Sequence, residues 1–179
     1  MPTYIAFLRG INVGGNSIIK MERLRDLWSK LSFKNVRTYV QSGNVVFDAE
    51  GPPSKWLGKI EAKLLAEMKR PISVIIRTAA DLEKLIARNP FQKDKSVNPA
   101  RLLVMFLSGS APKDSAKKIG AIDAGKDRFH FAGAEIFLHC INGISESKYF
   151  KTDFQKLLGV AVTGRNWNTV TKLYELASA

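Results

Sequence analysis

The sequence predicts an α+β protein of two pseudo-repeated halves, the first a ferredoxin-like β-α-β-β-α-β unit with a largely antiparallel sheet. Short apolar runs of strand length alternate with segments whose apolar residues recur at helical spacing. Short glycine-bearing turns join neighbouring strand-like runs into hairpins. The order of segments seen in residues 1–78 also returns in part after residue 100, which indicates an internal repeat.

The first half, residues 1–78, supplies every element of the ferredoxin-like plan. Its apolar runs predict strands at 4–8, 36–40, 45–47 and 72–76. Gln41-Ser42-Gly43-Asn44 forms the short loop of a hairpin between the second and third strands. Apolar residues at helical spacing predict two helices, one through Met21, Leu24, Leu27, Trp28 and Leu31, the other through Leu57, Ile60, Leu64 and Met68.

The second half, residues 79–179, is expected to form another α+β subdomain packed on the first. It opens with a helix that stops at Asn89-Pro90, because proline cannot continue a helix. The pattern then predicts a strand at 102–107, a helix at 112–122, a hairpin of 128–132 with 135–141, and helices at 149–158 and from Trp167. A helix stands where the last strand of the plan belongs, so we expect an incomplete repeat.

Composition narrows the classes of function. The 179 residues carry 28 basic and 16 acidic side chains, a net charge of +12 that favours phosphates, nucleotides or nucleic acid, or serves solubility alone. One cysteine and two histidines predict neither a disulfide nor a metal site, and no cofactor is expected. No apolar run reaches the roughly 18 residues of a membrane span, so no membrane partner is expected. Absence of a signal sequence predicts a cytoplasmic protein.

The stretch Arg9–Ser17, RGINVGGNS, resembles a phosphate-binding P-loop without being one. Asn16 stands where a P-loop has its lysine, and helical periodicity begins only near Lys20 or Met21. A P-loop also belongs to a parallel sheet, whereas this order predicts an antiparallel one. Two interpretations stay open: an anion-receiving loop of another design, or a structural glycine turn.

Ferredoxin-like topology places several polar segments on one edge of the first sheet. The end of the first strand, the start of the first helix, the 41–44 hairpin and the turn Lys69-Arg70-Pro71 all meet there. Backbone amides of a glycine loop and a helix N-terminus suit an anion, and arginine binds carboxylate or phosphate through two bonds. The candidate ligand-binding residues at this edge are Arg9, Gly10, Asn12, Gly14, Gly15, Lys20, Gln41, Ser42 and Asn44.

A second candidate cluster lies near the C-terminus. Thr163 or Asn166 is placed to cap the last helix, with Arg165 beside the cap and Trp167 on the apolar face. Lys148 precedes another expected helix. We add Arg165, Asn166 and Lys148 to the ligand-binding set, although a capping residue and a solvated lysine are the plainer interpretations.

Several of these motifs resemble one bacterial protein family. The segments are Leu8–Gly15, Tyr39–Phe47, Asn89-Pro90-Phe91, Gly143 with Ser147-Lys148, and Thr163–Leu173. By them the chain is identified as a member of the domain of unknown function 1697 family, a resemblance that spans nearly the whole chain. The resemblance implies an α+β fold of two related subdomains and no established activity.

Three functions therefore remain in view. The first is binding of an anionic small ligand, a nucleotide or phosphorylated metabolite, at a basic rim between the two halves. The second is nucleic-acid binding through the positive surface, and the third is an interaction module without catalysis. No nucleophile, general base and orienting acid come together in the sequence, so whether the protein is an enzyme stays undecided.

Overall fold

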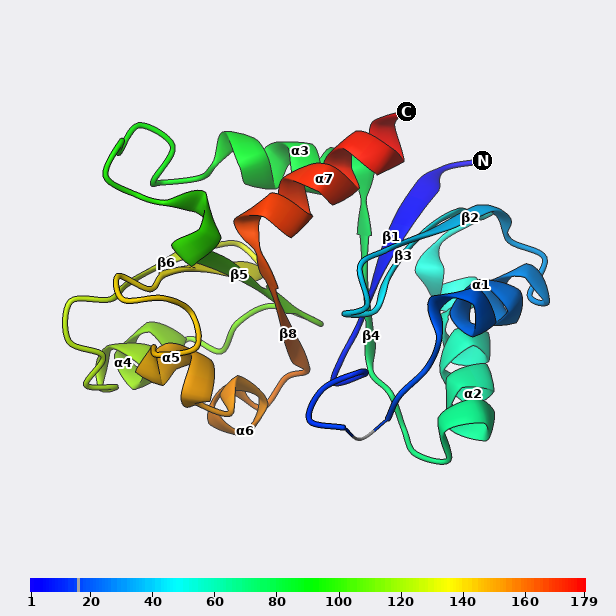
Figure 1. Ribbon diagram of the computed structural model, residues 1–179, viewed down its shortest axis with the longest axis horizontal. Coiled ribbons are helices and arrows are strands. Elements are labelled where there is room, and N and C mark those ends of the chain that lie inside the picture. The colour runs from blue at the N-terminus through cyan, green and yellow to red at the C-terminus, as the bar shows by residue number, and fades with distance from the viewer. Residues whose placement is uncertain (16) are drawn as a thin grey trace. The chain divides into compact units, whose positions relative to one another are not determined.

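The computed structural model describes residues 1–15 and 17–179 (Figure 1). Contacts within this chain divide it into two compact units. The first unit comprises Met1–Leu82 with Leu173–Ala179, and the second unit comprises Glu83–Lys172. Each unit contains one four-stranded antiparallel sheet, as the expected pseudo-repeat requires.

The first unit has the predicted β-α-β-β-α-β order. Its elements are β1 (Thr3–Leu8), α1 (Met21–Ser29), β2 (Lys34–Tyr39), β3 (Asn44–Asp48), a short 3₁₀ turn (Pro53–Lys55), α2 (Leu57–Met68) and β4 (Val74–Thr78). α3 (Ala79–Ala87) follows. The sheet order is β2-β3-β1-β4, so β1 and β3 are the central strands and the hairpin lies where the sequence placed it.

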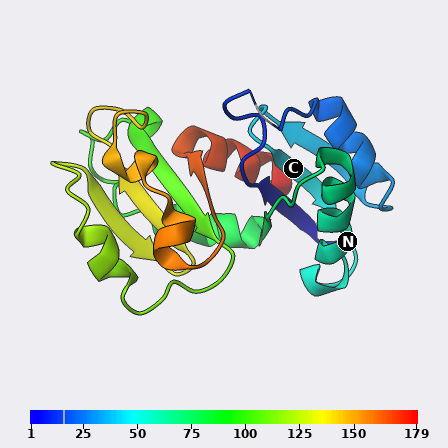
Figure 2. The same cartoon turned by 90° about the horizontal axis from the view of Figure 1, so that it is seen from below.

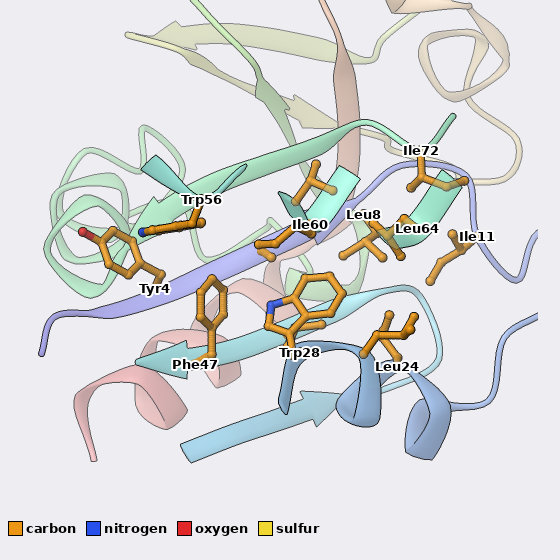
Figure 3. Close-up of a cluster of buried hydrophobic side chains, with 14 of the residues drawn as sticks. Tyr4, Leu8, Ile11, Leu24, Trp28, Phe47, Trp56, Ile60, Leu64 and Ile72 are labelled. Carbon is orange, nitrogen blue, oxygen red and sulfur yellow. The ribbon is translucent and has the colours of Figure 1, made fainter. Parts of the chain in front are cut away.

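One face of this sheet carries the core of the first unit (Figure 3). Tyr4 and Leu8 of β1 point to the same side as Phe47 of β3, because side chains alternate along a strand. The Phe47 ring centroid lies 4.7 Å from that of Phe33 and 5.4 Å from that of Trp56. Helices α1 and α2 add their apolar faces through Leu24, Leu27, Trp28, Ile60 and Leu64.

The second unit repeats the plan with shorter helices. Its elements are a 3₁₀ turn (Pro99–Arg101), β5 (Leu102–Leu107), α4 (Ser115–Gly120), β6 (Arg128–Ala132), β7 (Glu135–His139), α5 (Lys148–Lys151), α6 (Phe154–Leu158) and β8 (Val162–Asn166). α7 (Trp167–Ser178) begins in this unit, and its residues from Leu173 belong to the first unit. The sheet order is β6-β7-β5-β8, the same arrangement as in the first unit. In Figure 2 its strands β5, β6 and β7 run from green to yellow, while β8 and the short helices α5 and α6 are orange.

Two expectations for the second half were wrong. The repeat is complete, because β8 pairs with β5 along its length and supplies the fourth strand. The helix expected over 149–158 is two short helices, since the Asp153 side chain accepts a hydrogen bond from the Lys156 amide and caps α6 separately. The predicted helix from Trp167 is confirmed as α7.

The core of the second unit lies between its sheet and its short helices. Leu103, Ile136 and Leu138 of the strands are buried with Tyr149, Phe154 and Leu158 of α5 and α6. Cys140 is fully buried in this cluster, and burial raises the pKa of its thiol. Within residues 1–15 and 17–179, no helix is long and apolar enough to cross a membrane, and no three metal-ligating side chains gather.

Candidate functional site

The edge of the first sheet where β1 ends is built from three segments. We call these segments the rim: residues 9–20 between β1 and α1, residues 40–44 of the β2–β3 hairpin, and residues 69–73 before β4. The Leu8 amide donates to the Gly43 carbonyl (2.9 Å), and the Arg9 amide donates to the Ser73 carbonyl (3.0 Å). Backbone hydrogen bonds on both sides of β1 therefore fasten the three segments together, as the topology predicted.

Asn12 holds the 9–20 segment in place. Its side-chain Nδ2 donates to the carbonyls of Gln41 (2.7 Å) and Ile19 (3.1 Å), while its Oδ1 accepts from the Ile19 amide (2.8 Å). The Asn12 amide also donates to the Ser17 carbonyl (3.1 Å). One asparagine thus closes the loop of residues 13–18 at its base and ties it to the hairpin.

Gly43 brings the hairpin against the 9–20 segment. Its φ of +82° is a left-handed conformation that favours glycine, and a Cβ there would lie 2.7 Å from Ile11 Cδ1. On the opposite side of the segment, Arg70 Nη2 donates to the Gly10 carbonyl. Contacts from both neighbours therefore set the path of the chain as it leaves β1.

The loop inside this frame is open to solvent. Gly14 and Gly15 have φ of +64° and +74°, are exposed, and leave empty space where a Cβ would stand. Lys20 precedes α1 in an extended conformation, is exposed, and its side chain does not cap the helix. Exposed loop amides beside a helix N-terminus are the elements from which anion sites are made. The prediction that concerns Asn16 lies outside the described residues.

The hairpin residues of the predicted site differ in their exposure. Gln41 and Ser42 are exposed, whereas Asn44 is fully buried. Asn44 Nδ2 donates to the Tyr39 carbonyl (3.0 Å) and to Ser42 Oγ (2.9 Å), so it holds the turn together. A ligand at the rim would meet Gln41 and Ser42, with Asn44 supporting the turn behind them.

Three predicted site residues lie in the second unit. Arg165 is a buried residue of β8 that donates through Nη1 to Thr163 Oγ1 and to the Gly164 carbonyl (both 2.8 Å), and burial lowers its pKa to about 10. Asn166 caps α7, because its Oδ1 accepts from the Thr169 amide (2.8 Å). Lys148 pairs with Asp123 (3.5 Å). That these residues share a ligand with the rim stays a prediction.

The chain belongs to the family described as "Protein of unknown function (DUF1697)". Residues 1–137 match that family, which confirms the membership that the sequence motifs indicated. Among solved structures, the chain is similar to "conserved bacterial protein SP0830 from Streptococcus pneumoniae", with a TM-score of 0.80 and 22% identity over 98% of each chain. At that identity the likeness shows a shared fold. No curated protein matches the chain.

Sequence reasoning missed a polar cluster in the second unit of this family member. Arg128 Nη2 lies 3.1 Å from Asp94 Oδ2 and 3.1 Å from His139 Nδ1, and the guanidinium stands 4.9 Å from the centre of the Phe91 ring. The signal was available, because a turn at Gly133-Ala134 pairs Arg128 with His139 across the hairpin. The cluster connects the 89–101 segment to β6 and β7.

Proposed function

We propose that the protein binds an anionic, phosphate-bearing small ligand at the rim of the first unit. The observation that carries the proposal is the fastening of the 9–20 loop to the hairpin by Asn12. Because of these bonds, the exposed backbone of Gly14 and Gly15, the side chains of Gln41 and Ser42, and the cation of Lys20 belong to one edge.

The charge of the rim supports an anion rather than a neutral ligand. In sequence, its three segments contain no aspartate or glutamate and four basic residues, namely Arg9, Lys20, Lys69 and Arg70. Positive φ at Asn12, Gly14, Gly15 and Ser17 turns several amides of the loop, two of them adjacent, in directions that extended chain does not allow. Such amides bind phosphate without a side-chain donor, which suits a loop that lacks the P-loop lysine.

The proposal is tested by thermal unfolding of the full chain with inorganic pyrophosphate, nucleotides and phosphorylated sugars. A ligand at about a hundred times its Kd stabilises the folded state by about 2.7 kcal/mol, which raises Tm measurably. We expect the shift to fall in Lys20→Ala and to persist in Lys34→Ala, which removes an equal charge at the opposite end of the same sheet. No shift with any of these compounds, or equal shifts in both variants, would refute the proposal.

The nucleic-acid alternative rests on net charge alone. RNA-recognition modules with this plan stack bases on aromatic side chains of their central strands. Here the central-strand aromatics Tyr4 and Phe47 are buried in the core with α1 and α2. Phe7 of β1 alternates with them onto the other face together with Ile5, but it is fully buried too, so no central-strand aromatic is exposed for stacking. Oligonucleotide binding with a steep salt dependence would reinstate this alternative.

A further inference from the structure

The rim carries an unusual set of exposed apolar side chains. Val13 and Ile18 are 66% and 71% exposed, and Val40 is 47% exposed. These are three of the six large hydrophobic side chains that are exposed in residues 1–15 and 17–179, and the others are Met1, Leu65 and Phe150. Single exposed apolar residues are ordinary on protein surfaces, but a group of them marks a contact surface.

Hydrogen bonds of Asn12 bring the three side chains into one neighbourhood. Val13 follows Asn12 directly, Ile18 lies between the two residues whose backbones bond to Asn12, and Val40 precedes Gln41, whose carbonyl accepts from Asn12.

The backbone at Val40 adds to this pattern. Its φ is +49°, in the left-handed region, where a β-branched side chain is a rare and costly exception. Burial does not compensate for this cost, since the side chain is about half exposed. The turn therefore presents an apolar side chain to solvent at a position where valine is unfavourable.

Basic residues lie on the same rim segments as these apolar side chains. Lys20 is exposed beside Ile18, and Arg70 reaches the Gly10 carbonyl and so lies next to the same segment. Two acidic residues flank the rim along the chain: Glu22, in the first turn of α1, and Glu67, which precedes Lys69 and is paired with Arg23. A surface that is both apolar and positive matches the interface of a bilayer with negatively charged lipid head groups.

We propose that the rim docks on an anionic phospholipid bilayer, with Val13, Ile18 and Val40 inserted between head groups and Lys20, Lys69 and Arg70 paired with lipid phosphates. This inference rests on the proposed function, because the lipid phosphate is the anion that the same amides and cations receive. The expectation that there is no membrane partner came from the lack of a spanning segment, and binding at the bilayer surface needs none.

Co-flotation of the full chain with phosphatidylcholine vesicles, with and without phosphatidylglycerol, tests the inference. We expect binding only when phosphatidylglycerol is present, with affinity falling as salt rises. Lys20→Ala should weaken binding roughly fivefold, and Lys34→Ala should leave it unchanged. The double variant Val13→Ser/Ile18→Ser should weaken it at least as much, whereas Phe150→Ser, which alters a 55% exposed residue of the second unit, should not.

Pyrophosphate binding by the same proteins separates the inference from the proposed function. If Val13→Ser/Ile18→Ser loses vesicle binding and keeps both pyrophosphate binding and heparin binding, the inference is supported. If the wild type binds pyrophosphate but no vesicles, the bilayer is excluded while the small-ligand site stands. Heparin serves as a soluble polyanion without an apolar phase. If the double variant loses heparin binding as much as vesicle binding, the partner is an acidic macromolecule and the inference is overturned. If the wild type binds neither pyrophosphate nor vesicles, both proposals are overturned.

Discussion

Arg77 and Arg165 occupy equivalent positions in the two units. Arg77 of β4 lies opposite Ile5, the third residue of β1, and Arg165 of β8 lies opposite Val104, the third residue of β5. Each guanidinium donates through Nη1 to the carbonyl of the preceding residue at 2.8 Å. Each arginine is also followed by one capping residue and then a helix. The repeat therefore extends to the position and local bonding of single side chains.

The caps that follow these arginines lead to a first prediction. The Thr78 Oγ1 accepts from the Asp81 amide (3.1 Å) before α3, as the Asn166 Oδ1 accepts from the Thr169 amide before α7. Asn166→Ala should lower the free energy of unfolding by about 1 kcal/mol, because it leaves a first-turn amide without a partner. Urea denaturation measures the change. Asn168→Ala, two residues along at an exposed position of α7, is the control and should unfold close to wild type.

The repeat also shows why sequence patterns predicted the first unit better than the second. Strands β1, β3 and β4 of the first unit contain apolar runs, such as residues 74–76, which periodicity detects. By contrast β8, Val-Thr-Gly-Arg-Asn, has little intrinsic strand preference, so its pairing depends on tertiary contacts. At Gly164 a Cβ would lie 2.9 Å from Met105 Sδ on the neighbouring strand β5, so any larger residue there would require the methionine side chain to move. No local pattern reveals that close approach.

The same distinction applies to the rim. Glycine spacing and topology were sufficient to bring the 9–20 segment and the hairpin together, since both follow from the order of strands. The bonds of Asn12 were not predictable, because they join residues seven and twenty-nine positions apart through one side chain. Exposure of Val13, Ile18 and Val40 also escaped prediction, because apolar residues beside strands are ordinarily buried.

Asn12→Ala provides a second prediction. It removes three side-chain hydrogen bonds, two of them to the Ile19 backbone and one to the Gln41 carbonyl. We expect a loss of about 1–3 kcal/mol in the free energy of unfolding and weaker pyrophosphate binding, because the loop is no longer tied to the hairpin. Asn142→Ala, at an exposed residue of the second unit, is the control. Wild-type stability and binding in Asn12→Ala would show that the loop keeps its place without this side chain.

Two glycines of the rim make a matched pair for a third prediction. Both Gly43 and Gly14 have positive φ, but only at Gly43 would a Cβ meet neighbours, with Ile11 at 2.7 Å and Leu8 at 2.9 Å. Gly14→Ala should therefore cost only backbone strain, about 1 kcal/mol, and Gly43→Ala should cost about 1–3 kcal/mol more because the hairpin must move away. Comparison of the two urea midpoints at constant m value measures the difference. Equal midpoints would mean that the hairpin accommodates a methyl group freely.

The last prediction concerns pH and His139. Burial, followed by the positive charge of Arg128, lowers the pKa of His139 below its usual value of about 6.5. Arg101 acts in the same direction, whereas Asp94 and Asp127 oppose it. With a depressed folded-state pKa, the unfolded chain binds more protons at mildly acidic pH. Stability is therefore full above about pH 6.5 and declines as the pH falls from there toward the folded-state pKa.

Replacement of His139 isolates this contribution. His139→Gln should flatten the decline in the free energy of unfolding between pH 7 and pH 5, roughly the range below the unfolded-state value of histidine. His130→Gln is the matched control, because His130 is an exposed residue of β6 that lies opposite Phe137. It should leave the decline as steep as in wild type. If His139→Gln left the slope unchanged, Arg128 and Asp94 would hold the 89–101 segment independently of the imidazole, and the acid sensitivity would belong to other groups.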